Sequence, residues 1–510
     1  MKRHVGSSAR AVALALAAGL LGASAHAEAP FALSELPVKG RTVAARLAEL
    51  DGDGRTDLLA VNFRGIPPDE RREIHVRYQR ADGGFGLAAD AVLPLPLDAA
   101  AYDMATLEPG GPEELLLLRR DRVSRLSFRG RTATWRQVDA GGPTAAIAPD
   151  ERGLDPMILA RTGLAGGPHL TIPGLSELIV ALPSGAIVAR LQLDARANYF
   201  IPPRPGPLIG ENEFEVYLDQ PRIEFGDVDG DGLADVIATQ RHAIHIFRQR
   251  AGGELPPRPD QVVALRRLSP GDHVRGSGSV RATTGDLDGD GRADLLLAHA
   301  SEGLLDARAE TSIHLNRGGE WNLAEADQRF VTEGGFVTEE LVDLDGDGAV
   351  ELISARIPLS ALELAEIFLT RSVDVHVAIR RRAAGGPFAE RASYERKFSI
   401  PFSFETFRPR GFLGNVAADW NGDGLRDLLL SGSGKALEVY LGAEDEPFAK
   451  RVARQGFDTN GRIQAGDLDD DGLPDFVLFD PRRSDVPIRV GRNLGTLPGT
   501  PARSEIRAAP

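Results

Sequence analysis

The segment Asp286-Leu-Asp-Gly-Asp-Gly-Arg-Ala-Asp294 is followed directly by three leucines, Leu295–Leu297. Carboxylates stand at positions 1, 3, 5 and 9 of this segment, and glycine stands at position 6. The same pattern recurs in six segments of the chain, and each is followed by an apolar run typical of a buried strand. Such recurrence at a regular spacing indicates a repeat protein.

The side chains at positions 1, 3, 5 and 9 are the candidate metal ligands. Carboxylates at alternate positions of a loop that glycine makes sharp suit Ca²⁺, which takes about 6–8 oxygen ligands. An EF-hand is excluded, because position 12 lacks the bidentate glutamate that this motif needs. We therefore predict up to six structural Ca²⁺ ions. In chain order the candidate ligands are Glu49, Asp51, Asp53 and Asp57; Asp227, Asp229, Asp231 and Asp235; Asp286, Asp288, Asp290 and Asp294; Asp343, Asp345, Asp347 and Glu351; Asp419, Asn421, Asp423 and Asp427; and Asp467, Asp469, Asp471 and Asp475.

Two further segments, Thr106–Glu114 and His169–Glu177, keep the final acid and the apolar run but have lost the loop acids. We predict that they bind no metal. With them, eight segment starts follow one another at intervals of 48–76 residues. One period contains about four short strands, for example Leu295–Ala298, Ser312–Asn316, Trp321–Phe330 and Phe336–Val342.

Four strands repeated radially form the blade of a β-propeller. The fold class is therefore all-β, and we predict a propeller of eight blades, with seven as the alternative. The last period stops near Asn493, before its fourth strand, while Phe31–Val38 precedes the first loop without a blade of its own. We expect Phe31–Val38 to close the ring.

These residues resemble FG-GAP/VCBS repeats, the propeller type at the head of integrin α chains and in many secreted bacterial proteins. Phe225-Gly226, directly before Asp227, matches the dipeptide that names the family. The resemblance covers essentially all of the chain after the N-terminal segment. It implies that Ca²⁺ is held in the loop between the first two strands of a blade.

The N-terminal segment has the features of a targeting signal. Lys2, Arg3 and Arg10 precede the apolar run Ala11–Ala23, and Ala25-His26-Ala27 is typical of a signal peptidase site. The run is too short to span a bilayer, which takes about 20 residues. We predict a signal peptide over 1–27, a single propeller domain over 28–510 without a membrane span, and export to the periplasm or the outside.

Composition limits the possible functions. The chain of 510 residues has no cysteine, which excludes disulfides and thiolate metal sites. Its formal charge of −15 argues against nucleic acid as a partner, because phosphate binding needs a basic surface. No motif of metalloproteases, serine hydrolases or phosphate loops occurs. We expect a monomer.

Two segments stand out from the repeat. Arg119–Arg136 contains seven arginines, and it is either a grip for an acidic glycan or carboxylate-rich partner, or a solvated strand face. Ser360-Ala-Leu-Glu363 is a capping box that predicts a helix over Ala361–Thr370 in the longest interval. That helix is either a docking element or a packed spacer.

The sequence favours a non-catalytic, Ca²⁺-stabilised propeller that binds a glycan or protein ligand, as in adhesion. One alternative is a polysaccharide-degrading enzyme of the lyase type on the same fold, which rests on fold analogy. Another is an envelope assembly scaffold that presents surfaces to other proteins.

Overall fold

Each acidic loop ends where its apolar run begins, and that run forms the second strand of a small antiparallel sheet. In the segment around Asp294 the sheet order is β21 (Ser279–Gly285), β22 (Asp294–Ala300), β23 (Arg308–His314) and β24 (Gln328–Glu333). The prediction of one strand over Trp321–Phe330 is wrong. Trp321 lies in the loop before β24, where its buried indole donates a hydrogen bond to the Ala293 carbonyl, 2.8 Å away.

The chain is described by a computed structural model over most of its length. The predicted signal peptide, 1–27, lies outside the described residues. The described residues are 29–66, 68–146, 154–161, 163–164, 166–193, 197–200, 215–218, 221–265, 279–300, 308–318, 321–333, 336–358, 360–382, 385–404, 408–409 and 415–501. None of the helices in these ranges is long and apolar enough to cross a membrane.

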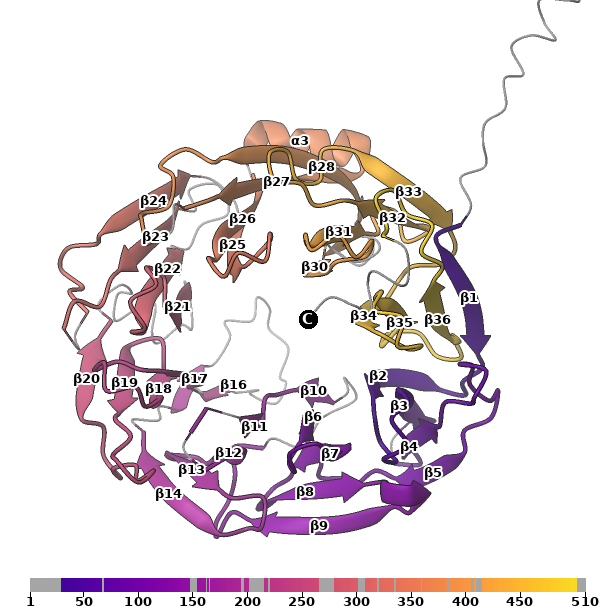
Figure 1. Ribbon diagram of the computed structural model, residues 1–510, viewed down its shortest axis with the longest axis horizontal. Helices are drawn as coiled ribbons and strands as arrows, with labels where there is room; N and C mark the ends of the chain where they lie inside the picture. Colours follow the sequence, from indigo (N-terminus) through magenta and orange to yellow (C-terminus); the bar gives the residue numbers. More distant parts are fainter. Residues whose placement is uncertain are drawn as a thin grey trace, which may run out of the picture.

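Eight such sheets, of four or five strands each, are arranged in a ring (Figure 1). The prediction of an eight-bladed β-propeller is confirmed, and the alternative of seven blades is wrong. Each blade is numbered in chain order from the N-terminus. Blade 1 contains β2 (Arg41–Ala48), β3 (Asp57–Arg64), β4 (Arg71–Arg77) and β5 (Ala91–Pro94); blade 2 contains β6 (Ala101–Thr106), β7 (Glu113–Leu118), β8 (Arg122–Ser127) and β9 (Thr134–Asp139), with β10 (Asp155–Pro156) beside β6; blade 3 contains β11 (Ala160–Arg161), β12 (His169–Pro173), β13 (Glu177–Ala181) and β14 (Ile187–Gln192).

The remaining blades follow the same order. A separate two-stranded hairpin, β15 (Ala197–Phe200) and β16 (Glu215–Leu218), stands between blades 3 and 4 in the chain. Blade 4 contains β17 (Arg222–Gly226), β18 (Asp235–Thr239), β19 (Ala243–Phe247) and β20 (Gln261–Ala264); blade 5 is β21–β24; blade 6 contains β25 (Phe336–Val342), β26 (Glu351–Ile357), β27 (Ser372–Arg380) and β28 (Tyr394–Ser403), with β29 (Arg408–Pro409) beside β28; blade 7 contains β30 (Asn415–Ala418), β31 (Asp427–Leu430), β32 (Ala436–Tyr440) and β33 (Arg451–Gly456); blade 8 contains β34 (Arg462–Gly466), β35 (Asp475–Phe479) and β36 (Ile488–Asn493).

The fourth strand of blade 8 comes from the other end of the chain. β1 (Phe31–Leu36) pairs antiparallel with β36, from Phe31 opposite Asn493 to Leu36 opposite Ile488. The expected ring closure is confirmed, and the strand ends at Leu36, two residues earlier than predicted.

The core lies between neighbouring blades, and this explains why the second strands are apolar along their length. In β3, Leu59 packs with Leu117 of blade 2, whereas Leu58 packs with Val477 of blade 8. All four side chains are buried. Because successive side chains of a strand point to opposite faces, a blade buried on both faces needs apolar residues at both.

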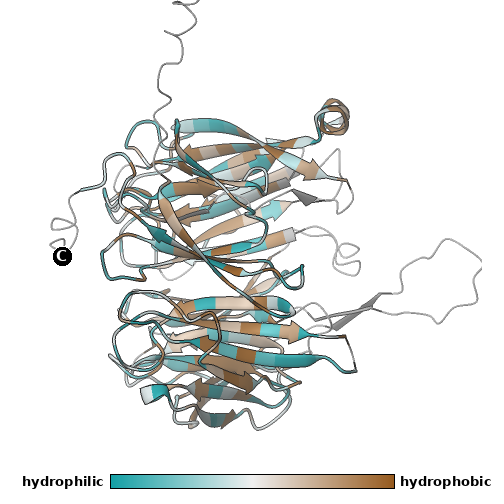
Figure 2. Ribbon diagram, turned by 90° about the vertical axis from the view of Figure 1, so that its right-hand side faces the viewer, coloured by the Kyte–Doolittle hydropathy of each residue, from teal (hydrophilic) through white to brown (hydrophobic). Residues whose placement is uncertain are grey.

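Connections from first to second strands and from second to third strands lie at opposite ends of a blade, because the strands are antiparallel. The acidic loops are of the first kind. The helix α3 (Ala361–Thr370) joins β26 to β27 and is of the second kind. It therefore belongs to the face opposite the acidic loops, and it lies at the outer rim beside β27 and β28 (Figures 1 and 2).

The predicted helix is confirmed at both ends. The Ser360 hydroxyl accepts a hydrogen bond from the Glu363 backbone N–H at 3.3 Å, as a capping box requires. Arg371 ends the helix in the left-handed conformation, with φ of 55°.

Candidate functional site

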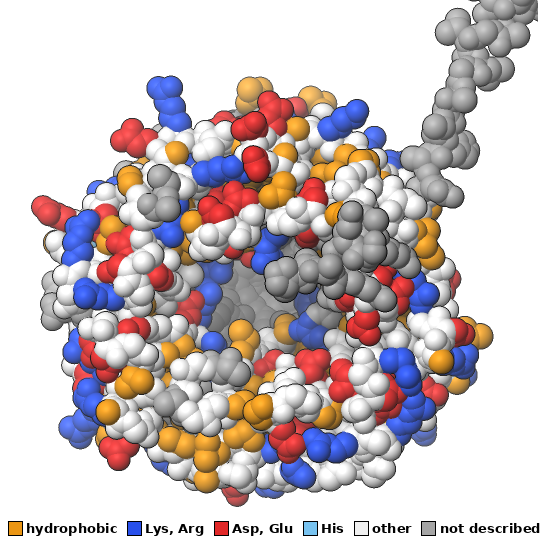
Figure 3. Space-filling model, in the orientation of Figure 1, with side chains coloured by type: hydrophobic (Ala, Val, Ile, Leu, Met, Phe, Trp, Pro, Cys, Tyr) orange, Lys and Arg blue, Asp and Glu red, His pale blue; other side chains and the backbone are white. Residues whose placement is uncertain are grey.

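The six acidic loops connect the first and second strands of blades 1, 4, 5, 6, 7 and 8. This is the position that the resemblance implied. The loops share one face of the ring, and Figure 3 shows a hollow at its centre with acidic and basic side chains interspersed around it.

The carboxylate at position 1 holds each loop in its sharp turn. In blade 4, Asp227 accepts hydrogen bonds from the backbone N–H groups of Gly230, at 2.6 Å, and Gly232, at 2.7 Å. Both glycines have positive φ, 79° and 84°, which a side chain would oppose. The same pair of bonds recurs at Asp286, Asp343 and Asp419. Position 1 thus shapes the loop through backbone hydrogen bonds.

Five of the loops bring their own carboxylates into tight groups. Within each group, one oxygen of each residue lies within 4.8 Å of the others. The groups are Glu49, Asp51 and Asp53; Asp227, Asp229 and Asp231; Asp286, Asp288 and Asp290; Asp343, Asp345 and Asp347; and Asp467, Asp469 and Asp475.

At position 3, buried carboxylate oxygens without hydrogen-bond donors indicate a place for a cation. In blades 4 and 6, Oδ1 of Asp229 and Oδ1 of Asp345 are buried and receive no hydrogen bond. A buried carboxylate oxygen without a donor is costly, unless a cation coordinates it. Together with the neighbouring carboxylates at positions 1 and 5, these oxygens form the hard, oxygen-only donor set that Ca²⁺ prefers. The residues present therefore fit the ion that the family resemblance implies.

Position 9 has a structural role that the sequence analysis missed. In blade 5, Oδ2 of Asp294 accepts from the Leu287 N–H at 2.7 Å and Oδ1 accepts from the Asn316 N–H at 2.8 Å. One carboxylate thereby ties the acidic loop to the end of the third strand. Asp57, Asp235, Asp427 and Asp475 make the same two kinds of bond. We call these residues the clamp aspartates.

The clamp aspartates are fully buried, and burial is the main cause that raises their pKa. The values are about 7 for Asp57, Asp427 and Asp475, and about 6 for Asp235 and Asp294. The two backbone N–H groups oppose this shift, and the negative charges of the loop reinforce it. The loops therefore concentrate negative charge on groups that burial already disfavours in the ionised form.

The loop of blade 7 has a different donor set. Asn421 is buried, and its amide nitrogen donates to Asp423 Oδ2 at 2.9 Å and to the Pro498 carbonyl at 3.0 Å. The amide nitrogen, rather than the amide oxygen, thus faces the carboxylate at position 5. The third position of this loop therefore presents a donor, rather than an oxygen ligand, to position 5.

The two degenerate segments are held by arginine. In blade 2, the buried Glu114 carboxylate accepts from both Nε and Nη2 of Arg125, at 2.9 and 2.8 Å. In blade 3, Glu177 accepts from Arg190 at 2.6 Å. In each case the arginine comes from the following strand, β8 or β14.

The arginine-rich stretch Arg119–Arg136 is largely engaged within the fold. This argues against a free grip for acidic ligands; the stretch is mainly the solvated face that was the alternative, except that Arg125 is buried. Five of its seven arginines form ion pairs: Arg119 with Asp98, Arg122 with Asp121, Arg125 with Glu114, Arg129 with Glu108, and Arg131 with Asp51.

The helix α3 presents apolar side chains to solvent. Leu362, Phe368 and Leu369 are 79%, 67% and 85% exposed, whereas Leu364 and Ile367 lie closer to the blade. The Phe368 ring stacks on Phe404 beyond β28, with ring centroids 4.9 Å apart. Four apolar side chains thus form an exposed surface at the rim, which we call the α3 face: Leu362, Phe368, Leu369 and Phe404.

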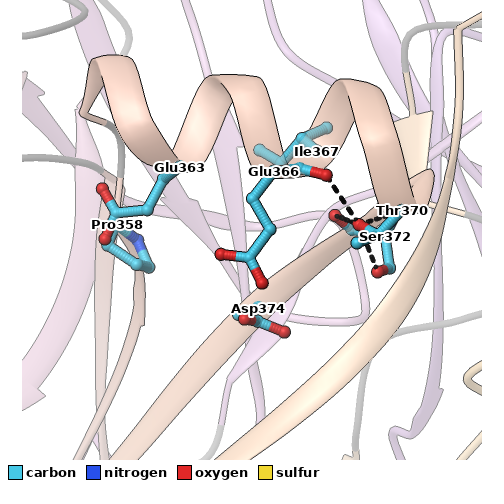
Figure 4. A pocket seen from close by; sticks show the side chains of 7 residues that line it. All are labelled: Pro358, Glu363, Glu366, Ile367, Thr370, Ser372 and Asp374. Carbon is cyan, nitrogen blue, oxygen red and sulfur yellow. Dashed lines mark hydrogen bonds between the residues drawn. The ribbon is translucent and has the colours of Figure 1, made fainter.

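Acidic side chains lie beside the α3 face. Figure 4 shows Glu363 and Glu366 of the helix above Asp374 of β27, in a pocket closed at one end by Thr370 and Ser372. The Thr370 hydroxyl donates to the Glu366 carbonyl at 2.8 Å, and Lys397 forms an ion pair with Asp374. The apolar surface is therefore flanked by carboxylates on its inner side.

A further hollow lies between blades 5 and 6, on the face of the acidic loops and opposite to α3. It has a volume of about 370 Å³ and is lined by residues that include Asp288, Arg317, Asp327 and Phe388. A neighbouring hollow of about 480 Å³ shares Arg317 and Asp327 with it. Together they make a polar groove next to an acidic loop.

Comparison with known protein families supports the repeat identified in the sequence. Residues 227–297 and 419–478 match the protein family described as FG-GAP-like repeat. The first match extends from the acidic loop of blade 4 into β22 of blade 5, and the second extends from the loop of blade 7 into β35 of blade 8. The chain is a β-propeller that contains FG-GAP-like repeats.

This FG-GAP-repeat propeller is also similar to solved structures. They include an Agrocybe aegerita lectin that recognises non-reducing terminal N-acetylglucosamine (13% identity, 82% of this chain and 81% of the lectin covered, TM-score 0.34). The Vibrio cholerae biofilm matrix protein Bap1 has 10% identity, with 91% and 89% covered and a TM-score of 0.36. Sqt1 from Chaetomium thermophilum has 12% identity, with 90% and 99% covered and a TM-score of 0.43. No curated protein matches the FG-GAP-repeat propeller in sequence.

Proposed function

We propose that this FG-GAP-repeat propeller is an exported, calcium-binding protein that acts by binding a protein partner through the α3 face, without catalysing a reaction. The observation that carries the proposal is the exposure of Leu362, Phe368 and Leu369 on a helix inserted into an otherwise regular blade. Contiguous exposed apolar side chains on a soluble domain are typical of an interaction surface.

The surroundings of the α3 face indicate the chemistry of its partner. Glu363 and Glu366 lie beside the apolar side chains, so a complementary partner carries apolar residues with lysines or arginines next to them. The same acidic flank opposes pairing with a second copy, because like charges would then meet. The partner is therefore a different protein, and the propeller itself is a monomer.

A glycan ligand has less support from the described residues. Sugar platforms use exposed aromatic rings, and two of the three tryptophans, Trp321 and Trp420, are buried; the exposed ring of Phe368 belongs to the α3 face. Trp420 packs edge-on against Phe31 in the closing blade, with ring centroids 5.5 Å apart, which is a structural role. The polar groove between blades 5 and 6 is the place where a glycan would be sought.

Calcium has a supporting role in this proposal. Bound at positions 1, 3 and 5, the ion offsets the repulsion among loop carboxylates and stabilises one face of the ring. Chelation therefore acts on stability and leaves the α3 face, on the opposite side, chemically unchanged.

The test is selection of peptides from a random display library on calcium-loaded protein that lacks 1–27. We expect enriched peptides to combine apolar residues with lysine or arginine. They should lose at least tenfold in affinity for a Leu362→Asp/Leu369→Asp variant and keep it for Leu87→Asp, a matched change at a residue that is 68% exposed elsewhere. Equal binding to both variants contradicts the proposal.

Catalysis and export are tested separately. Incubation with neutral and acidic polysaccharides should release no product, and any product overturns the non-catalytic assignment in favour of a degrading enzyme. N-terminal sequencing of the exported protein should begin at Glu28, and a retained N-terminal segment contradicts export by signal cleavage.

A further inference from the structure

We propose that Arg131 occupies the acidic loop of blade 1 as a built-in cation, so that this loop holds a guanidinium where its counterparts are built to hold a metal ion. The inference rests on the proposed calcium binding only for the comparison with the other loops. It divides six loops of similar sequence into two chemical kinds.

The first observation is the state of the position 3 carboxylate. In blade 1, Oδ2 of Asp51 accepts a hydrogen bond from Arg131 Nε at 2.8 Å, and Oδ1 accepts from the Asp53 N–H at 3.0 Å. The Asp51 side chain is only 2% exposed. Both of its oxygens are thus satisfied, whereas the equivalent Oδ1 atoms of Asp229 and Asp345 are buried without a donor.

The second observation is how the arginine is delivered. Arg131 ends a short 3-10 turn, Arg129–Arg131, after β8 of the neighbouring blade 2 and adopts a φ of 63°, which is uncommon for a residue with a side chain. The preceding Gly130 donates its N–H to the Asp51 carbonyl at 2.7 Å. The backbone of blade 2 is therefore fastened to the loop, and the guanidinium is held over it.

The third observation is the support around the guanidinium. Its central carbon lies 4.7 Å from the centroid of the Tyr78 ring, and Nη2 lies 3.5 Å from Asp53 Oδ2. A cation over an aromatic face and between two carboxylates is stabilised from three sides.

Other blades show how this arrangement differs. In blades 1, 4 and 8, the residue at the end of the third strand whose N–H binds the clamp aspartate is preceded by a side chain near the loop. That preceding residue is Tyr78 in blade 1, but it is Arg248 in blade 4 and Arg492 in blade 8. Arg248 and Arg492 approach the position 3 carboxylate of their own blade only to 3.7 Å. In blade 1 the place of that arginine is taken by a ring, and a closer arginine comes from the neighbouring blade.

Arg131 and a calcium ion compete for Asp51. Ca²⁺ binds carboxylate oxygens at roughly 2.3–2.6 Å, and both Asp51 oxygens already accept hydrogen bonds, one of them from Arg131 Nε. Blade 1 is therefore expected to keep its loop formed in the absence of calcium, through an ion pair with a blade that has no acidic loop of its own.

The test counts tightly bound calcium per chain by isothermal titration and elemental analysis in four proteins: wild type, Arg131→Ala, Asp51→Asn and the double variant. We expect Arg131→Ala to bind one ion more than wild type. Asp51→Asn alone should leave the count unchanged, and in the Arg131→Ala background it should remove the additional ion. Arg129→Ala is the matched control, because Arg129 lies two residues before Arg131 and its exposed side chain pairs with Glu108; this change should leave the count unaltered.

Two results overturn the inference: an unchanged count in Arg131→Ala, or a loss of one ion in Asp51→Asn alone. Asp53→Asn replaces Asp51→Asn if the latter fails to fold, because Asp53 is more exposed. If wild type binds no calcium at all, the calcium part of the proposed function fails, but one ion gained by Arg131→Ala still supports the role of Arg131. In calcium-free buffer, Arg131→Ala should also melt several degrees below wild type and recover when calcium is added.

Discussion

Glu114 and Arg125 form a bidentate ion pair inside blade 2, with side chains that are 9% and 4% exposed. Arg125 also donates to the Pro183 carbonyl of blade 3, so the pair joins two blades that have no acidic loops. Breaking a buried pair by removing one partner leaves an uncompensated charge, which costs about 3–5 kcal/mol. Arg125 is thus a structural residue within an arginine-rich stretch.

We expect Arg125→Ala to lower the free energy of unfolding by several kcal/mol, measured by denaturant titration. Arg122→Ala is the control, because Arg122 pairs with Asp121 at the surface and its loss should leave the midpoint nearly unchanged. Equal unfolding midpoints for both variants would show that the buried ion pair does not contribute to the free energy of unfolding.

The clamp aspartates and the carboxylates at position 5 should respond differently to substitution. Asp294→Ala leaves two buried N–H groups unpaired, at about 1–3 kcal/mol each, so it should destabilise the protein even in excess chelator. Asp290→Ala should lower calcium affinity but leave the melting temperature in chelator close to that of wild type. Thermal melts with and without calcium measure both, and similar melts of the two variants in chelator would refute the distinction.

Calcium removal should lower the melting temperature of the wild-type protein substantially. A ligand present at about 100 times its Kd stabilises the folded state by about 2.7 kcal/mol per site. Without the ion, the grouped carboxylates of blades 4, 5, 6 and 8, whose ligand oxygens lie within 4.8 Å of one another, repel each other. Differential scanning calorimetry measures the melting temperature in calcium and in EDTA, with magnesium as the control ion. Identical melting temperatures in calcium and EDTA would exclude bound structural calcium.

Glu339 on β25 should make stability depend on pH. Burial raises its pKa above the usual range of glutamate, opposed by hydrogen bonds from Thr311 and Ser354. The folded state then binds a proton more tightly than the unfolded chain, so this residue lowers stability as pH rises from the unfolded pKa through the folded one.

We therefore expect Glu339→Gln to be more stable than wild type at pH 7, with a difference that shrinks at pH 5. Denaturant titration of both proteins in EDTA at the two pH values measures it. A difference that grows towards pH 5 has the wrong sign and would contradict the assignment.

Much of this architecture follows from the sequence because its cause is local. The acids and glycines of one segment shape one loop, and the apolar run after Asp294 forms β22 by itself. The last period stops near Asn493 before a fourth strand, and the strand at Phe31 has no blade of its own; together these two features predict the ring closure. Ser360 and Glu363 likewise define the start of α3 within four residues.

Other features depend on contacts between distant parts of the chain, which no local pattern reveals. Arg131 reaches Asp51 from the neighbouring blade, and it looked like one more member of a charged strand. Trp321 resembled the start of a strand, although its indole is used to anchor a loop. The clamp role of Asp294 becomes visible only with Asn316 in place, because its second partner is a backbone group on another strand.

The pairing of β1 with β36 also sets an order of events during synthesis. β1 is made before any blade, yet its partner strand appears only after seven blades have been completed, so the first strand must remain unpaired for nearly the whole of translation. A chain that stalls or is cut within blade 8 keeps an exposed edge on each side of the gap. Such edges readily accept a strand from another molecule. Incomplete chains should therefore exchange strands and aggregate, and intact ones are protected only by the last strand to arrive.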